Sequence, residues 1–372
     1  MTLTEEVVEL VARLVAIDSV NPSLVEGGAG EGEIAAFVAR WARDNGLEVQ
    51  VLEETSGRPS VVARAPGSGT GRTLLLCGHL DTVNVEGMSN PHTPRIVGDR
   101  LHGRGAYDMK AGVAAALLAA REAAGLGLAG DVVVAAVADE EHASLGVQEA
   151  LRAVRADAAI VTEPTELELV VAHKGFVWAE IELTGVAAHG SRPQLGVDAI
   201  VKAGPVLTAI GELDSALGAR THPLLGRGSV HASVIEGGVE MSSYPARCVI
   251  GLERRTLPGD TQEDIDRELA ALGGSKHSIT LVREPFEVDP DSAVVTSVSA
   301  AAAQLLGAEP KVTGASYWAD AAFIAAAGIP TVMFGPGGEG AHAIEESVSI
   351  RDTVAVTRVL VAVAQDLCSS HT

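Results

Sequence analysis

LLLCGHLD at residues 74–81 is an apolar run that ends in a histidine and an aspartate. An uninterrupted apolar run is typical of a strand buried on both faces, as in a parallel sheet covered by helices. His79 and Asp81 are two residues apart, so in an extended chain their side chains point the same way. Binding sites of open α/β sheets lie beyond the carboxyl ends of the strands. The run therefore predicts an α/β fold with a site that begins at His79.

Helix and strand patterns alternate on both sides of this run. The expected helices cover about residues 4–16, 31–45, 110–124 and 146–155, and the expected strands 48–53, 60–64, 132–138 and 158–162. Such alternation is the pattern of a mainly parallel sheet flanked by helices.

The order of elements changes at Phe176. We expect strands at 176–183, 229–235, 247–254 and 278–283, with helices at 197–217 and 261–272. This βαββαβ order predicts a two-layer α+β unit. Helix and strand alternate again after Pro285. We therefore predict a catalytic domain of residues 1–175 and 285–372, interrupted by an inserted domain at 176–284.

Size, charge and cysteine content limit the classes of protein. A chain of 372 residues exceeds the size of one hydrophobic core, which fits two domains. A formal charge of −22 repels phosphate backbones and anionic lipid, so we expect neither nucleic acid nor a membrane as a partner. Three widely spaced cysteines form no disulfide framework, and the N-terminus lacks the basic start of a signal peptide. We expect a cytoplasmic protein.

Acidic and histidine side chains recur at the ends of further expected elements. Asp108 follows a glycine-rich turn, Glu140 and Glu141 follow the strand that ends at Ala138, and Glu163 follows the strand at 158–162. A last histidine, His342, comes shortly after GPGG at 335–338. An α/β sheet would gather these side chains at one edge.

Two imidazoles and three carboxylates are suitable ligands for zinc or a similar ion. If Asp108 bridges, each of two ions has one histidine, one terminal carboxylate and the shared one, with room for a bridging metal-bound hydroxide. Glu140 points away from its neighbour Glu141, which favours it as the general base. Asp81 would hold the second nitrogen of His79. We expect two divalent ions, zinc first, with cobalt or manganese as alternatives.

Each of these signals has an ordinary explanation when taken alone. A histidine at a strand end is commonly structural, and a Glu-Glu pair is commonly a solvated turn. The turn at 103–105 is half of a dinucleotide-binding fingerprint, but the full GxGxxG pattern is absent. Cys77 has apolar neighbours, so it is expected in the core.

Taken together, five motifs resemble those of the M20 metallopeptidase family. This family groups acetylornithine deacetylases, succinyl-diaminopimelate desuccinylases, aminoacylases and glutamate carboxypeptidases. The matching segments are GHLDTV at 78–83, GRGAYDMKAG at 103–112, DEEHASLG at 139–146, TEPT at 162–165 and GPGGEGAHAIEESV at 335–348.

The resemblance implies a di-zinc exopeptidase-like fold and assigns roles to the candidate residues. Glu140 would be the general base, and Asp81 would support a metal-binding histidine. The implied ligands are His79, Asp108 and Glu163 for one ion, and Asp108, Glu141 and His342 for the other.

The resemblance also gives the inserted domain a function. It implies that 176–284 is a lid through which two chains form a homodimer. His189, within GVAAHGSRPQLGVDA at 185–199, would reach the partner's active site and stabilise the oxyanion. Arg255, within GLERRTLPGD at 251–260, would bind the substrate carboxylate, with Arg254 as the alternative if the strand register differs.

The expected function is hydrolysis of the amide bond of an N-acyl amino acid, similar to that of the acetylornithine or succinyl-diaminopimelate branch. A carboxypeptidase or dipeptidase with the same metal core is the first alternative. A non-catalytic binding or assembly protein on the same fold is a more distant one.

Overall fold

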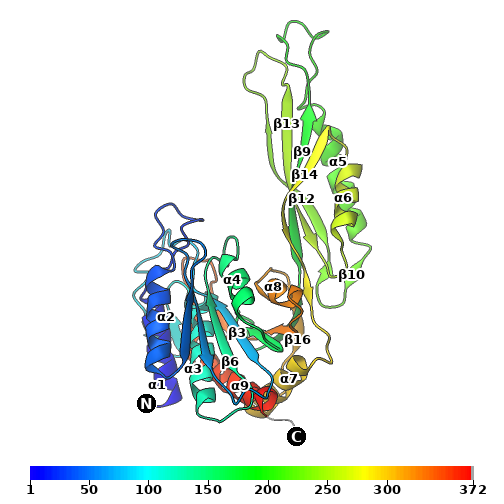
Figure 1. The fold of residues 1–372 in the computed structure, drawn as a ribbon. Coiled ribbons are helices and arrows are strands. Elements are labelled where there is room, and N and C mark those ends of the chain that lie inside the picture. Colours follow the sequence, from blue (N-terminus) through cyan, green and yellow to red (C-terminus); the bar gives the residue numbers. More distant parts are fainter. Residues whose placement is uncertain (370–372) are drawn as a thin grey trace. The chain divides into compact units, whose positions relative to one another are not determined.

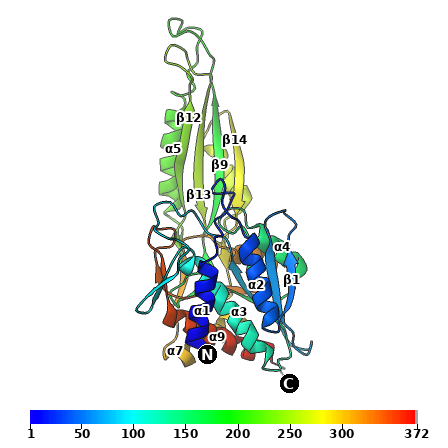
Figure 2. The same ribbon diagram turned by 90° about the vertical axis from the view of Figure 1, so that its left-hand side faces the viewer.

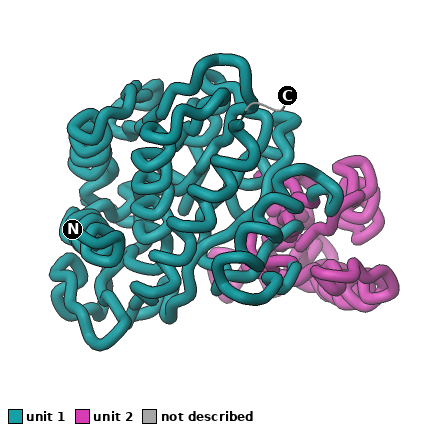
Figure 3. Tube along the Cα trace, turned by 90° about the horizontal axis from the view of Figure 1, so that it is seen from below, with its two compact units in different colours: residues 1–171, 288–313, 319–372 teal, residues 172–287, 314–318 magenta. Residues whose placement is uncertain are grey.

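The structure is a computed structural model that describes residues 1–369 of the chain. It consists of two compact units. Unit 1 comprises residues 1–171, 288–313 and those from Ala319 onward, and unit 2 comprises 172–287 and 314–318 (Figure 3, teal and magenta). The insertion that we predicted from the sequence was 176–284.

A large mixed sheet contains β3, the strand formed by the apolar run that ends at His79. Its strand order is β1-β2-β6-β3-β7-β17-β8-β15, with β16 paired to β8. The strands are β1 Glu48–Leu52, β2 Ser60–Ala65, β3 Leu74–His79, β6 Val132–Val137, β7 Ala158–Val161, β8 Leu169–His173, β15 Phe286–Glu287, β16 Val312–Ala315 and β17 Thr331–Met333. The central strands β6, β3, β7 and β17 are parallel, whereas β1, β2, β8 and β15 pair antiparallel.

Strand direction follows from the connections. A parallel neighbour needs a crossover of about a dozen residues or more, whereas a short connection gives an antiparallel pair. Residues 53–59 join β1 to β2 directly, and these strands are antiparallel. A helix lies between β3 and β6 in the chain, and another lies between β6 and β7. Both β6 and β7 are parallel to β3, their common neighbour in the sheet. The predicted α/β class, with a central sheet flanked by helices, is confirmed.

Helices cover the central strands, whose residues in β3, β6 and β7 are all buried. Helix α3 contacts α1 and α9, and α9 contacts α7, while α4 contacts α8 and α2 lies against β1 and β2 (Figures 1 and 2). These helices are α1 Leu3–Val15, α2 Gly32–Asp44, α3 Ala111–Ala124, α4 Leu145–Ala153, α7 Ala293–Leu306, α8 Ala321–Ala326 and α9 Ile350–Cys368. Among residues 1–369, no helix combines the length and the apolar character needed to cross a membrane.

A small sheet in unit 1 joins two loops that are distant in sequence. Its order is β18-β19-β5-β4, formed by β4 Arg95–Val97, β5 Arg100–His102, β18 Gly338–Glu339 and β19 Ser347–Ser349. Strands β5 and β19 are antiparallel, with Ser347 opposite His102. The sheet therefore brings the segment after His102 beside the segment before Ser347.

Unit 2 is an antiparallel sheet with helices on one face. The sheet order is β12-β13-β9-β14, and a short hairpin, β10–β11, precedes β12. The elements are β9 Gly175–Thr184, α5 Ala203–Leu217, β10 Thr221–His222, β11 Gly226–Arg227, β12 Ser229–Gly237, β13 Arg247–Thr256, α6 Gln262–Ala271 and β14 Lys276–Arg283. Every second residue of β9 joins the core shared with the helices, namely Val177, Ala179, Ile181 and Leu183.

The helix expected at 197–217 begins later than predicted. In the structure α5 begins at Ala203, and the residues before it form turns. Pro205 thus lies in the first turn, where its missing N–H removes no helical hydrogen bond.

Candidate metal centre

Four predicted site residues lie at or just beyond the carboxyl ends of three neighbouring parallel strands. His79 is the last residue of β3, Glu140 and Glu141 follow β6, and Glu163 follows β7. Register aligns His79 with Val137 of β6, two positions before Asp139. Because parallel strands end at the same edge of the sheet, these side chains converge there.

Asp108 and His342 reach this edge on loops. Asp108 lies in the short helical segment η1, Ala106–Lys110, and His342 lies between β18 and β19. One carboxylate oxygen of Asp108 is 3.1 Å from Nε2 of His79, and the other is 3.3 Å from Nε2 of His342. Nε2 of His342 is also 3.2 Å from Oε1 of Glu141. Asp108 therefore stands between the two histidines and presents one oxygen to each.

Glu140 and Glu163 also lie near His79. An oxygen of each is 4.0 Å from Nε2 of His79. Two groups of side chains have ligand atoms within 4.8 Å of one another: His79, Asp108 and Glu141, and His79, Glu140 and Glu163. The assignment of Glu163 as a ligand and of Glu140 as the base remains a prediction, since the two carboxylates are equally near His79.

The second nitrogen of His79 is held by the main chain of Asp81. Nδ1 donates to the carbonyl oxygen of Asp81 at 2.9 Å, while the nearer carboxylate oxygen is 3.7 Å away. This hydrogen bond keeps the Nδ1 proton in place, so Nε2 is the nitrogen that can bind a cation. We expected the carboxylate in this position.

The carboxylate of Asp81 instead organises the turn after β6. It accepts hydrogen bonds from the backbone N–H groups of Glu140 and Glu141, at 3.1 and 3.2 Å. The side-chain amide of Asn21 donates to Asp81 at 2.8 Å and to Asp139 at 3.0 Å. Asn21 was not predicted as part of the site, because one asparagine before a proline gives no sign of a distant partner in the sequence.

A second buried network lies behind the same turn. Arg58 donates to Glu31 at 2.7 and 2.8 Å and to Asp139 at 2.7 Å. The side chains of Glu31 and Asp139 are fully buried, and that of Arg58 is 8% exposed. Nothing in the sequence around Arg58 or Glu31 predicts this network. Together with Asn21, they fix the backbone that presents Glu140 and Glu141.

Burial and crowding shape the charges of the cluster. Burial, reinforced by neighbouring carboxylates, raises the pKa of Glu163 to about 8 and that of Glu140 well above its ordinary value. Burial also opposes charge on Asp108, but hydrogen bonds with the two histidines outweigh it and lower its pKa. Hydrogen bonds with two carboxylates raise the pKa of His342 to about 10. Burial and like charges thus raise the pKa values of Glu140 and Glu163, whereas hydrogen bonds between opposite charges shift those of Asp108 and His342.

Divalent cations fit this cluster by charge and by donor chemistry. A bound cation stabilises the excess negative charge of a buried site. Raised carboxyl pKa values mean that protons can neutralise the same charge. Imidazole nitrogens and carboxylate oxygens are ligands of zinc, and cobalt and manganese accept the same donors. The residues present therefore suit a site for divalent metal ions.

His189 and Arg255 belong to unit 2. His189 is exposed in the segment between β9 and α5, and its Nδ1 is 2.8 Å from the hydroxyl of Ser191. Arg255 lies near the end of β13, donates to Glu253 at 2.7 Å and stacks over the ring of Phe176 at 5.1 Å. The roles given to both residues remain predictions.

Register separates the two arginines that the sequence left as alternatives. Arg254 is buried on the helix-covered side of β13, where its guanidinium contacts Glu268 at 2.9 Å and Asp260 at 3.4 Å. Arg255, the next residue, points to the opposite face and is partly exposed. Arg255 is therefore the better placed of the two to meet a ligand from solvent.

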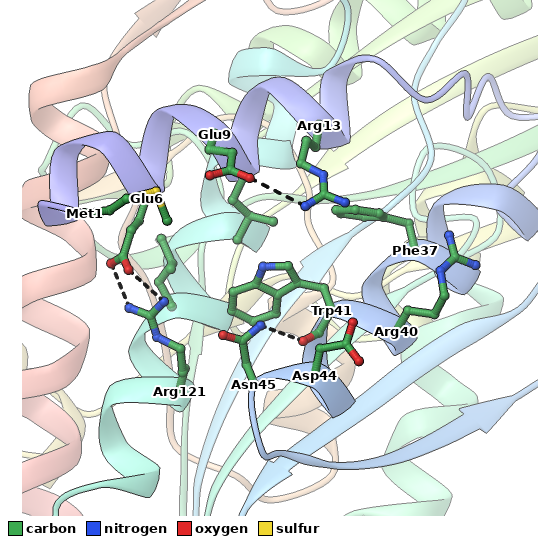
Figure 4. A pocket seen from close by; sticks show the side chains of 12 residues that line it. Met1, Glu6, Glu9, Arg13, Phe37, Arg40, Trp41, Asp44, Asn45 and Arg121 are labelled. Atoms are coloured by element: carbon green, nitrogen blue, oxygen red, sulfur yellow. Dashed lines mark hydrogen bonds and ion pairs between the residues drawn. The ribbon is translucent and has the colours of Figure 1, made fainter.

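A separate pocket of about 290 Å³ lies among α1, α2 and α3 (Figure 4). Its wall contains the rings of Phe37 and Trp41 and an ion pair between Glu6 and Arg121 at 2.8 Å. None of the predicted site residues lines it. The pocket is thus distinct from the cluster around His79.

The sequence is similar to those of a known family of enzymes. Residues 75–366 match the family described as peptidase family M20/M25/M40. An acetylornithine deacetylase of Proteus mirabilis is 32% identical over 92% of both chains, and one of Aliivibrio salmonicida is 30% identical over 91% of this chain and 92% of the relative.

Solved structures share the fold. A tripeptidase from Staphylococcus aureus superimposes with a TM-score of 0.80 at 20% identity, covering 98% of both chains. A dinuclear metal-binding peptidase of the M20 family from Bacillus subtilis gives a TM-score of 0.75 at 16% identity, again covering 98% of both chains.

Proposed function

Because the chain belongs to peptidase family M20/M25/M40, we propose that it hydrolyses the amide bond of an N-acyl amino acid. The chain is a metal-dependent hydrolase that acts on small amides or peptides. The finer assignment rests on one observation, the 32% identity to an acetylornithine deacetylase over nine-tenths of both chains. The acyl amino acids to try first are therefore acetylornithine and succinyl-diaminopimelate.

The proposed ligands divide the cluster into two cation sites that share Asp108. His79 and Glu163 complete one site, and Glu141 and His342 complete the other. The support is the position of Asp108, with one oxygen 3.1 Å from His79 and the other 3.3 Å from His342. Two divalent ions, zinc by preference, would polarise the scissile carbonyl and lower the pKa of an attacking water toward about 7.

Glu140 is the proposed general base. It takes a proton from the attacking water and delivers it to the departing amine, which keeps the amine from leaving as an anion. Its side chain is 11% exposed beside His79, and the Asp81 carboxylate holds its backbone N–H at 3.1 Å. A base held in one orientation and shielded from bulk water suits such a proton transfer.

Unit 2 is the proposed lid and dimerisation domain. Val239 and Met241, between β12 and β13, are 97% and 103% exposed, and β12 is an edge strand with free pairing positions on its outer side. Exposed apolar side chains beside an open strand edge are suited to pairing with a second copy. His189 would then stabilise the oxyanion in the partner, and Arg255 would bind the substrate carboxylate.

A hydrolysis screen tests the proposal. Purified protein is offered N-acetyl and N-succinyl amino acids, dipeptides and tripeptides, before chelation, after chelation and after zinc, cobalt or manganese is restored. We expect acetate or succinate to be released, and this release to depend on the metal. Free C-terminal amino acids from peptides without deacylation would replace the proposed substrate by that of a carboxypeptidase or dipeptidase. The cytoplasmic location expected from the sequence remains a prediction.

A further inference from the structure

Arg104 and Glu346 form a buried ion pair beside the metal centre, although neither is one of its proposed ligands. Nη1 of Arg104 donates to Oε2 of Glu346 at 2.7 Å, and their side chains are 2% and 0% exposed. A buried pair of opposite charges is costly to form unless its remaining hydrogen-bonding positions are satisfied. The partners of these two side chains show what the pair does.

Glu346 holds the loop that carries Asp108. Its carboxylate accepts backbone N–H groups of Gly105 at 2.9 Å, Tyr107 at 2.8 Å and Asp108 itself at 3.0 Å. An ionised carboxylate that accepts several N–H groups makes stronger hydrogen bonds than a neutral oxygen does. The position of the Asp108 main chain is therefore set by a residue four positions after His342.

Arg104 makes the reciprocal contact. It lies four positions before Asp108, and its Nη2 donates to the carbonyl oxygen of Ala343, the residue after His342, at 3.0 Å. Its Nε donates to the carbonyl oxygen of Asn84 at 3.0 Å. Each loop thus supplies one charged side chain that binds the main chain of the other loop.

The small sheet aligns these contacts. Strand β5 ends at His102, β19 begins at Ser347, and these two residues are opposite one another in the antiparallel pair. The N–H of Gly103 donates to the carbonyl oxygen of Glu346 at 3.2 Å, which continues the pairing toward the metal centre. The Arg104–Glu346 pair then spans the point at which the two loops diverge toward Asp108 and His342.

We propose that Arg104 and Glu346 are positioning residues that set the spacing between Asp108 and His342, and hence the affinity of the cation site that these two share with Glu141. The inference rests on the proposed function, because it takes these three side chains as ligands. The other cation site also uses Asp108, but it depends less on the pair, since its remaining ligands, His79 and Glu163, are placed by strands of the large sheet.

Two conservative variants test the proposal. Glu346→Gln keeps the size of the side chain. It places an NH2 group where a carboxylate oxygen accepts hydrogen bonds from backbone N–H groups. Arg104→Lys keeps the charge but loses the planar fork that reaches Glu346, Ala343 and Asn84 together. Loss of partners that orient metal ligands typically weakens metal binding about 10–100-fold.

The experiment measures binding of zinc and of cobalt to metal-free protein by calorimetry, with metal content after dialysis as a second readout. We expect two sites in the wild type. In both variants one site is weakened at least about tenfold and the other is little changed. Glu268→Gln, which removes a charge from the partly buried pair with Arg254 in unit 2, is the control and keeps both sites.

The outcomes separate this inference from the proposed function. Two sites of wild-type affinity in both folded variants would overturn it and leave the proposed function standing. Equal weakening of both sites would also overturn it, because the pair would then support the fold and not one site. If Glu346→Gln does not fold, Arg104→Lys and Glu346→Asp decide. A wild-type protein that binds no divalent ion would overturn the proposed function first.

Discussion

At the scale of single residues, Glu140 and Glu141 are neighbours with different surroundings. Glu141 faces Nε2 of His342 at 3.2 Å, whereas an oxygen of Glu140 lies 4.0 Å from Nε2 of His79. Adjacent side chains diverge, so one carboxylate can bind a cation while the other meets the attacking water. The carboxylate of Asp81 holds both backbone N–H groups and keeps this division in place.

Replacing Glu140 by alanine tests its role as a base. Positioned proton transfer contributes about 10²–10⁴-fold to the rate, so we expect kcat of Glu140→Ala to fall by that factor. Metal content should stay at the wild-type level, because the proposed ligands are unchanged. Glu122→Ala, on the exposed end of α3, is the matched control. Unchanged kcat in Glu140→Ala would refute the assigned role.

At the scale of elements, the turn after β6 depends on residues from three distant segments. Asn21, Arg58 and Glu31 meet at Asp139, whose side chain is fully buried. Arg58 is the cation among the surrounding carboxylates, and burial raises the pKa of Glu31 even beside it. The turn that presents Glu140, the proposed general base, is therefore stabilised by a network outside the candidate metal centre.

Arg58→Ala should destabilise the protein strongly. Removing one partner of a buried ion pair leaves an uncompensated charge and costs about 3–5 kcal/mol of unfolding free energy. Chemical denaturation of metal-loaded protein measures this loss. Arg152→Ala, which breaks an exposed pair with Glu54, should leave the unfolding midpoint close to that of the wild type. Equal midpoints for the two variants would contradict the importance given to the buried network.

The same elements show which features of the fold and the candidate site can be predicted from the sequence. The strand ends at His79 and Glu163 could be predicted, because buried strands give continuous apolar runs and ligands follow them. The Arg104–Glu346 pair could not, because 242 positions separate its members and a single charge in a loop has no periodicity. The start of α5 at Ala203 was missed for a local reason, since apolar residues before Pro205 continue the helical spacing into a turn.

At the scale of the whole molecule, metal ions and folding are linked. A ligand that binds only the folded state stabilises it by about 2.7 kcal/mol at a hundred times its dissociation constant. Chelation should therefore lower the melting temperature, and zinc, cobalt or manganese should restore it together with activity. Differential scanning calorimetry of metal-free and reloaded protein measures the shift. Identical melting curves with and without a chelator would contradict a structural contribution from the ions.

The proposed dimer makes a second prediction at this scale, because His189 would serve the active site of the partner while Glu140 serves its own. Glu140→Ala and His189→Ala are each expected to be nearly inactive. Co-expressed in one cell, they form mixed dimers in which one of the two sites has both residues intact. Random pairing makes about half of the dimers mixed, so the unfractionated mixture should have about a quarter of the wild-type activity and the purified mixed dimer about half.

A second pair of variants shows whether this recovery requires catalytic residues from both chains. Glu140→Ala co-expressed with Glu141→Ala breaks every site, because both residues lie in unit 1 and would act within their own chain, so no recovery is expected. Activity per mole of purified mixed dimer is the measurement, with differently tagged chains used to isolate it. If the mixed dimer with His189→Ala also stays inactive, His189 does not act across the dimer, and the role proposed for unit 2 is reduced to that of a lid.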